Sequence, residues 1–265
     1  MAFSFVQITD HHLQESESAT VRGFATWVSY RAVLRHIAQH VAGHIDFIVS
    51  MGDLVDPAPD PAYRAVLAAL HADPAGATAP GPLRVTAEGL EDMPMYFVPG
   101  NHDDLSAMLR VLFPGSPDME RMNVRFEHRG VRFVCLDWGR DPSAQATPEL
   151  FEFLAESLAD DRPAVILTHH AVAPVGAAWL DQFLARDVDR FWNIVRGRNV
   201  LGVLAGHVHM STEELVAGVP VYTLRSTGFQ FARQDQPATL LQPPHYRLIT
   251  IHDGVLTSRL YEVSI

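Results

Sequence analysis

Five short apolar runs, each followed within three residues by an acidic, amide or histidine side chain, dominate the hydrophobic pattern of the chain. They are residues 3–8, 45–50, 95–98, 164–168 and 200–205. Apolar runs this short, bounded by turn-forming residues, are typical of buried β-strands. The pattern therefore predicts five strands whose carboxyl ends all lead into polar chemistry.

Helical spacing of apolar residues separates these runs. Between residues 26 and 41 the apolar positions are Val28, Val33, Leu34, Ile37 and Val41, the spacing of one helix face. Similar spacing predicts helices at 61–70, 105–113, 148–158 and 188–195, and Thr147 is a suitable cap for the helix at 148–158.

Hairpin patterns mark the second half of the chain. One hairpin is predicted where alternating runs at 124–128 and 131–137 flank Arg129-Gly130. A second is predicted where runs at 246–252 and 256–263 flank Asp253-Gly254. A further strand is predicted at 219–225. Early alternation of strands and helices followed by hairpins predicts an α/β fold. The expected architecture is a four-layer α-β-β-α sandwich, in which helices flank two mixed sheets.

Residues 71–92 interrupt the regular pattern with Pro74, Pro80 and Pro82 and several glycines. Such a segment predicts a loop, a short hairpin or a flap. We therefore expect one domain over residues 1–265, with an insertion at about 71–92.

The composition and charge of the chain argue against some classes of binding partner. Hydrophobic residues make up 48% of the 265 positions, enough to bury a large core, and the formal net charge is −11. That charge argues against a nucleic acid polymer or an anionic membrane as partner, because both require a basic surface. The lone cysteine, Cys135, lies in an apolar run and is interpreted as a core thiol. Without a leader-like or membrane-spanning run, the expected location is cytoplasmic.

The polar clusters after the strands supply oxygen and imidazole groups in a fixed order. They are Asp10-His11-His12, Gly52-Asp53, Gly100-Asn101-His102-Asp103, His169-His170 and Gly206-His207-Val208-His209. Taken one at a time, the acids and the amide are ordinary turn or cap residues, and a histidine pair suits a surface strand. Taken together at strand ends they predict a centre for two divalent ions. Without thiolates, Mn, Fe or Zn suits this set.

This ordered set resembles the calcineurin-like metallophosphoesterase superfamily over nearly the whole chain. The resemblance implies that Asp10, His12 and His209 hold one metal ion, and that Asn101, His169 and His207 hold a second. It implies that Asp53 bridges the two ions and is essential for catalysis.

The resemblance also implies the reaction, in which a hydroxide between the two ions attacks phosphorus. His102 would be the catalytic residue that contacts the phosphate and assists the leaving oxygen, and the substrate would meet Asn101, His102 and His209. We interpret Asp103 as orienting an imidazole, and His11 and His170 as packing residues.

The branch of the superfamily follows from three segments. After Gly52-Asp53 the chain lacks the Arg-Gly pair of protein phosphatases. Residues 8–13, 99–104 and 226–231 look most like bacterial class III cyclic nucleotide phosphodiesterases and glycerophosphodiesterases. The implied substrate is a small anionic phosphodiester, with 3′,5′-cyclic nucleotides foremost, and the implied assembly is a homodimer. A glycerophosphodiester or phosphomonoester hydrolase, and a non-catalytic scaffold, are the alternatives. Arg225 and Phe229-Gln230-Phe231 are interpreted as structural, with pocket lining as the alternative.

Overall fold

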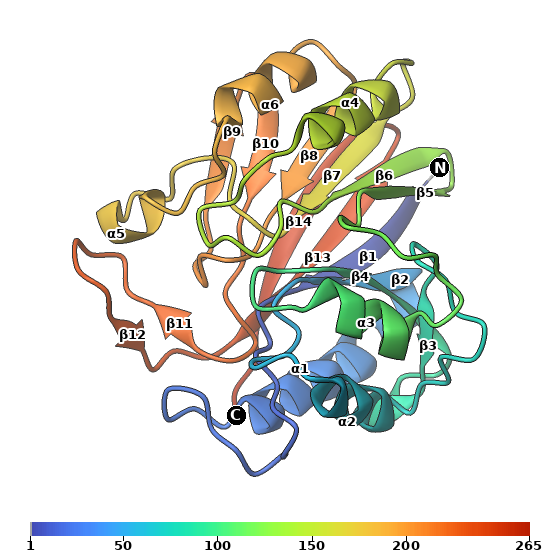
Figure 1. Ribbon diagram of the computed structural model, residues 1–265, viewed down its shortest axis with the longest axis vertical. Coiled ribbons are helices and arrows are strands. Elements are labelled where there is room, and N and C mark those ends of the chain that lie inside the picture. The colour runs from blue at the N-terminus through green and yellow to red at the C-terminus, as the bar shows by residue number, and fades with distance from the viewer. Residues whose placement is uncertain (1) are drawn as a thin grey trace.

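Two six-stranded sheets lie face to face in the computed structural model, which describes residues 2–265 (Figure 1). The first sheet has the strand order β14 (Val255–Glu262), β13 (His245–His252), β1 (Ala2–Ile8), β2 (Phe47–Met51), β4 (Met93–Val98), β3 (Leu83–Val85). The second has the order β5 (Val124–His128), β6 (Val131–Leu136), β7 (Ala164–Thr168), β8 (Val200–Leu204), β10 (Val219–Tyr222), β9 (Glu213–Val216). Both sheets mix parallel and antiparallel pairs.

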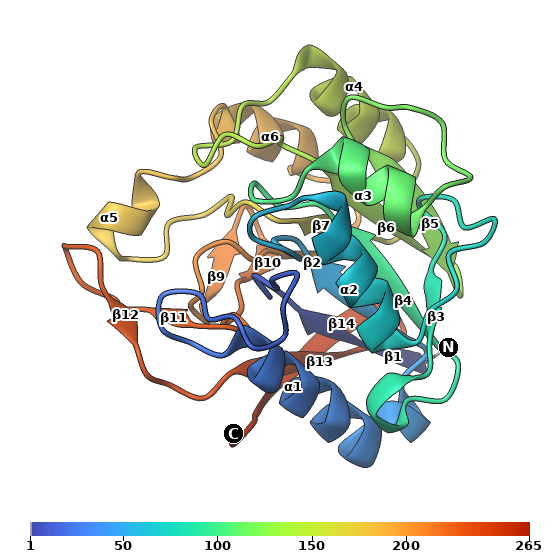
Figure 2. The ribbon, with the colours of Figure 1, turned by 60° about the horizontal axis from the view of Figure 1, so that its bottom comes forward.

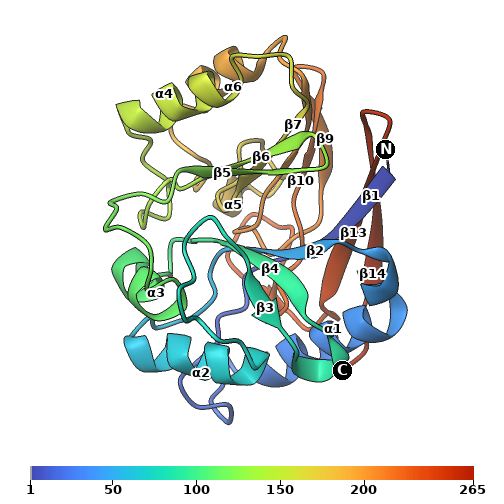
Figure 3. The same cartoon turned by 90° about the vertical axis from the view of Figure 1, so that its right-hand side faces the viewer.

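Helices cover the outer faces of the two sheets. Figure 3 shows the first sheet above α1 (Thr26–His40), α2 (Asp60–Leu70) and α3 (Leu105–Leu112), and the second below α4 (Pro148–Ser157) and α6 (Val188–Val195). The one-turn helices η1 (Ala42–His44), α5 (Ala178–Asp181) and η2 (Ala87–Gly89), and the small ribbon β11 (Gln230–Phe231) and β12 (Thr239–Leu240), complete the fold. The predicted α-β-β-α sandwich is confirmed.

Alternating side chains fill three apolar layers. In β1, Phe3 and Phe5 face the core between the sheets, whereas Val6 and Ile8 face the helices. This two-residue period is the normal geometry of a strand, and it explains why β1 is apolar on both sides. Cys135 lies in the core between the sheets, as predicted, and burial raises the pKa of its thiol to about 12.

Because several strands are parallel, their carboxyl ends lie at the same edge of the sandwich, which we call the rim. In the first sheet β1, β2 and β4 are parallel, and in the second β6, β7, β8 and β10 are parallel. The Gln7 amide joins the two sheets at this rim by donating to the carbonyl of Ala205 at 3.0 Å. Polar groups that follow these strands therefore meet at the same edge of the sandwich.

Residues 71–92 add β3 and η2 to the far edge of the first sheet. β3 pairs antiparallel with β4, next to which it lies in Figure 2. Glu88 forms ion pairs with Arg31 and Arg35 on α1. The segment is thus partly a strand rather than a plain loop, because it satisfies the edge of β4. Among the helices of residues 2–265, none is both long and apolar enough to cross a membrane.

Candidate metal and phosphoester site

The predicted ligand residues occupy the turns that follow five strands. Those of β1, β2 and β4 come from the first sheet, and those of β7 and β8 come from the second. Five of these residues adopt positive φ angles between 47° and 70°, which non-glycine residues rarely do: Asp10, His12, Asp53, His207 and His209. Such backbone conformations cost on the order of 1–3 kcal/mol each and cluster at functional sites.

One group of buried nitrogen and oxygen atoms joins the turns after β1, β2 and β8. The Nε2 atom of His209 lies 3.3 Å from Asp10 Oδ1 and 3.2 Å from Nε2 of His12. Asp53 Oδ2 is 3.6 Å from the same nitrogen of His12. These four side chains have atoms that all lie within 4.8 Å of one another, the spacing of a single metal site.

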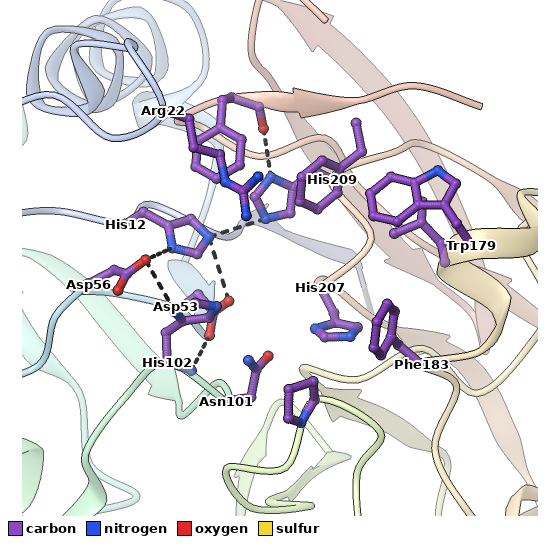
Figure 4. Close-up of a pocket in the computed structure, with 14 residues that line it drawn as sticks. His12, Arg22, Asp53, Asp56, Asn101, His102, Trp179, Phe183, His207 and His209 are labelled. Atoms are coloured by element: carbon purple, nitrogen blue, oxygen red, sulfur yellow. Dashed lines mark hydrogen bonds and ion pairs between the residues drawn. The ribbon is translucent and has the colours of Figure 1, made fainter. Parts of the chain in front are cut away.

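A second group surrounds the other oxygen of Asp53. Its Oδ1 atom lies 3.4 Å from Nε2 of His169, which is itself 3.2 Å from Oδ1 of Asn101. His207 completes this group, and atoms of His207, His169 and Asp53 fall within 4.8 Å of one another. The structure thus brings together all seven residues predicted as ligands. Figure 4 shows five of them where they line the pocket: His12, Asp53, Asn101, His207 and His209.

Asp53 is the residue shared by the two groups. Burial alone would raise its pKa, but His169 and His12 outweigh burial and hold the pKa of this carboxyl well below its usual range. The two oxygens are therefore both negatively charged acceptors, one aimed at each group. A bridging carboxylate has this arrangement.

Outer hydrogen bonds fix which nitrogen each imidazole presents to the centre. His169 Nδ1 donates to the Met51 carbonyl at 2.8 Å, and His209 Nδ1 donates to the Phe229 carbonyl at 2.6 Å. Each bond uses the outer nitrogen and turns a lone pair on Nε2 inward. This is the usual support of metal-binding histidines.

The neighbouring histidines have other partners. His11 uses both ring nitrogens, on Thr227 at 2.7 Å and Ser50 at 2.8 Å, and the ring of His170 reaches the Asp141 carbonyl at 3.0 Å. Both therefore support the turns, in keeping with their interpretation as packing residues.

The structure gives Asp103 a different role from the one predicted from the sequence. Instead of an imidazole, its carboxylate accepts hydrogen bonds from the amides of Gly100 and Leu54 and from the Tyr63 hydroxyl. It ties the turn after β4 to the turn after β2, because backbone amides in both turns need an acceptor.

Three glycines allow the turns to approach one another closely. A Cβ atom at Gly52 would overlap the His169 ring, one at Gly100 would overlap the Asp53 carboxylate, and one at Gly206 would overlap Thr9 beside Asp10. Gly52 also has φ +92°, which disfavours any side chain. The glycines of the sequence clusters therefore serve the packing of the ligands.

His102 lies beside the two groups rather than within either. Its backbone amide donates to Asp53 Oδ1 at 2.9 Å, and its Nδ1 atom is 3.1 Å from the carboxylate of Asp56. Burial lowers the pKa of His102, but Asp56 and Asp53 outweigh burial, so its pKa is raised overall. The imidazole is thereby biased toward the protonated form that can donate to an oxygen.

The sequence indicated only a loop-stabilising role for Asp56, so its part in the site was missed. Its carboxylate contacts both His102 and, at 3.4 Å, Nδ1 of His12. The signal that could have revealed it is its position three residues after Asp53, in the same turn. The Leu13–Val55 bridge holds this turn against the turn after β1, so Asp56 has little freedom to point elsewhere.

A pocket of about 260 Å³ opens over the centre, just below the roughly 300–1,000 Å³ typical of small-molecule sites. Its lining includes Arg22, whose guanidinium lies 5.5 Å from the Phe229 ring and 5.8 Å from the Phe231 ring. Phe229 and Phe231 thus line the pocket. Arg225, in contrast, bonds to Pro243 and Glu262 outside it.

The donor set fits metal ions. The two Nε2 atoms of His12 and His209 face each other in a buried setting, where a cation between them would satisfy both lone pairs. Burial lowers the pKa of His207 to about 3, which leaves that ring neutral and free to ligate. Nitrogen and oxygen donors without sulfur suit Mn, Fe or Zn.

Comparisons with known proteins agree with this geometry. The family described as calcineurin-like phosphoesterase matches residues 3–211. The 3′,5′-cyclic adenosine monophosphate phosphodiesterase CpdA of Vibrio vulnificus is 26% identical, covering 99% of this chain and 91% of its own. The CpdA of Escherichia coli K12 is 27% identical, with 98% and 89% covered. A dimetal phosphatase from Danio rerio superposes with a TM-score of 0.65 at 16% identity over 99% of both chains, which shows a common fold.

Proposed function

The chain belongs to the calcineurin-like phosphoesterase family, and from that premise we propose that it hydrolyses small phosphodiesters, 3′,5′-cyclic nucleotides foremost, at a centre of two divalent metal ions. One observation carries the proposal. The two oxygens of Asp53 each face a separate group of metal-compatible side chains, with Oδ2 toward His12 and Oδ1 toward His169.

We assign the ligands from these two groups. Asp10, His12 and His209 would hold one ion, Asn101, His169 and His207 the other, and Asp53 both. Two such ions, when bound, supply a nucleophilic water at neutral pH and neutralise charge on the phosphoryl oxygens. The loaded centre would thereby offset the acidic character of the pocket and attract an anion.

The side chains around the centre position the substrate and move a proton. The Asn101 amide, His102 and His209 would contact the phosphate. His102, protonated through its contact with Asp56, would donate its proton to the departing alkoxide as the P–O bond breaks. Asp56 acts through His102, as a positioning residue, because it stabilises the imidazolium.

Two observations favour a small diester over a protein or nucleic acid substrate. The pocket, at about 260 Å³, has the size of a small-molecule site, and the net charge of −11 opposes the approach of a polyanion. The Vibrio vulnificus and Escherichia coli relatives, which match nearly the whole chain, are cyclic AMP phosphodiesterases, and this favours a cyclic nucleotide among small diesters.

The direct test is turnover by protein depleted of metal and reloaded with Mn, Fe or Zn. Cyclic AMP, a glycerophosphodiester and a simple phosphomonoester would be compared under identical loading. We expect about two metal ions per chain and the highest kcat/KM for cyclic AMP. Less than one ion per chain with no hydrolysis would favour a scaffold. Preference for the glycerophosphodiester or the monoester would replace the proposed substrate.

A further inference from the structure

The pocket has a second side that the chemistry of the metal ligands does not use. Its lining includes four apolar side chains, which we name the apolar wall: Trp179, Leu180, Phe183 and Phe231. Figure 4 shows Trp179 and Phe183 across the pocket from Asp56 and His102. A substituent on a phosphate held at the centre would therefore lie between a polar side and an aromatic one.

The apolar wall is continuous with the ligands of the centre. The Phe231 ring stacks on the His209 imidazole, with centroids 4.3 Å apart and planes 23° from parallel. Trp179 packs edge-on against Phe231 at 5.0 Å. An aromatic surface thus begins at a residue of the centre and extends along the pocket, where the group attached to phosphorus would lie.

Hydrogen bonds hold the two segments of the wall together. Trp179 Nε1 donates to the Ala232 carbonyl at 3.2 Å, and the Arg233 guanidinium donates to the Val175 carbonyl at 2.6 Å. These bonds join the α5 segment to β11, so the wall is formed before any ligand arrives. Preformed aromatic surfaces bind with a smaller loss of conformational freedom.

The apolar wall should favour some groups attached to the phosphate over others. The single polar atom on its four side chains is Trp179 Nε1, which already donates to Ala232. A glycerol group pressed against the wall would lose water without gaining hydrogen bonds, which is unfavourable. A planar nucleobase has a π face and gains stacking energy against aromatic rings.

We propose that the apolar wall is a nucleobase subsite, in which the base of a cyclic nucleotide lies against Phe183 and Trp179 while its phosphate is held at the Asp53 centre. This inference rests on the proposed function and assigns specificity to residues outside the ligand set. Because stacking does not depend on the hydrogen-bonding edge of the base, cyclic AMP and cyclic GMP should differ by less than roughly tenfold in kcat/KM.

The test removes the base from the substrate and, in a separate experiment, the aromatic ring from the protein. Substrates are cyclic AMP and methyl ribofuranoside 3′,5′-cyclic phosphate, which keeps the cyclic diester and replaces the base by a methoxy group. We expect metal-loaded wild-type protein to prefer cyclic AMP by roughly 5- to 100-fold in kcat/KM, mainly through KM. Phe183→Ala should abolish most of this preference, and Phe183→Tyr, which keeps an aromatic face, should retain it.

A matched control is Phe153→Ala, which removes a half-buried phenylalanine on α4 outside the pocket and should leave the preference intact. Equal efficiency of wild-type protein on both cyclic phosphates would overturn the subsite while leaving the proposed function standing. An unchanged preference in Phe183→Ala would do the same. Hydrolysis of neither cyclic phosphate would overturn the proposed function, and the subsite with it.

Discussion

Asp56 shows how much of the chemistry depends on one carboxylate outside the ligand set. It lies 3.1 Å from His102, and its hydrogen bond is the largest of the interactions that raise the pKa of that imidazole against burial. In return, His102 and His12 overcome the effect of burial on Asp56 and lower its pKa. The pair is therefore a carboxylate and an imidazolium that stabilise each other's charge.

Asp56→Asn should shift the pH profile of kcat/KM. A proton donor is active below its pKa, so activity falls as pH rises through the pKa of His102. Removing the negative charge lowers that pKa and should move the alkaline limb to lower pH, without loss of metal. The measurement is a pH–rate profile with metal analysis. His102→Ala should lack this limb altogether, and an unshifted limb in Asp56→Asn would refute the pairing.

We expect Arg22 to contribute to substrate binding. It is the one lysine or arginine among the described residues that line the pocket, and it has no carboxylate partner among the ion pairs of residues 2–265. Arg22→Gln should raise KM for a cyclic nucleotide by roughly three- to tenfold and weaken the salt dependence of kcat/KM. Arg196→Gln, an equal change in net charge at an exposed site, is the control. Identical behaviour of the two variants would remove Arg22 from substrate binding.

Short turns after parallel strands are the elements that build the centre. Backbone hydrogen bonds join them: the amide of Asp10 donates to Gly52, that of His12 to Asp53, and that of Gly206 to His169. Such turns can approach one another only where side chains are missing. The glycines are therefore as necessary for the arrangement of these turns as the ligand residues are.

Gly52→Ala should reduce both stability and metal binding. The added Cβ atom meets the His169 ring, and the φ of +92° penalises alanine, so a loss of more than about 1 kcal/mol is expected. Thermal unfolding and metal content measure the two effects. Gly43→Ala is the matched control, because nothing lies within 4 Å of its Cβ position and its φ is ordinary. Full metal content in Gly52→Ala would contradict the packing argument.

Shortening residues 74–81 should leave turnover unchanged. No residue of 71–92 lines the pocket, and the segment instead contacts Gly115 and Ser116 beyond α3. We expect a lower melting temperature, because those contacts are lost, with unchanged kcat and KM for cyclic AMP. Altered substrate preference in the shortened protein would assign the segment a role in the site.

At the scale of the whole molecule, the centre joins the two sheets. Asp10, His12, Asp53 and Asn101 follow strands of the first sheet, and His169, His207 and His209 follow strands of the second. Ions bound there would connect the two halves of the sandwich. Binding to the native state alone stabilises that state by about 2.7 kcal/mol when the free ion exceeds its Kd a hundredfold.

Metal removal should therefore lower the melting temperature of the whole protein. For a chain of this size a loss of 2.7 kcal/mol corresponds to a decrease of roughly 5–10 °C. Calorimetry with and without a chelator measures the change. Asp53→Ala, which loses the shared ligand, should melt at the same temperature in both conditions and have almost no turnover, whereas the exposed Asp118→Ala should behave as wild type. A chelator effect in Asp53→Ala would refute the bridging assignment.

Apolar periodicity along the chain was enough to predict the strands that carry the ligands, the sandwich and the set of residues that meet at the rim, because these depend on local properties. The short strands β3, β9, β11 and β12 lack a clear local signal, and the sequence did not predict them as separate strands. Features that depend on contacts between distant turns became visible in the folded protein alone. These include the two oxygens of Asp53 facing different groups, the pairing of Asp56 with His102, the backbone role of Asp103, and the apolar wall that joins α5 to β11. Such contacts are set by how the turns and sheets pack, which no local pattern along the chain records.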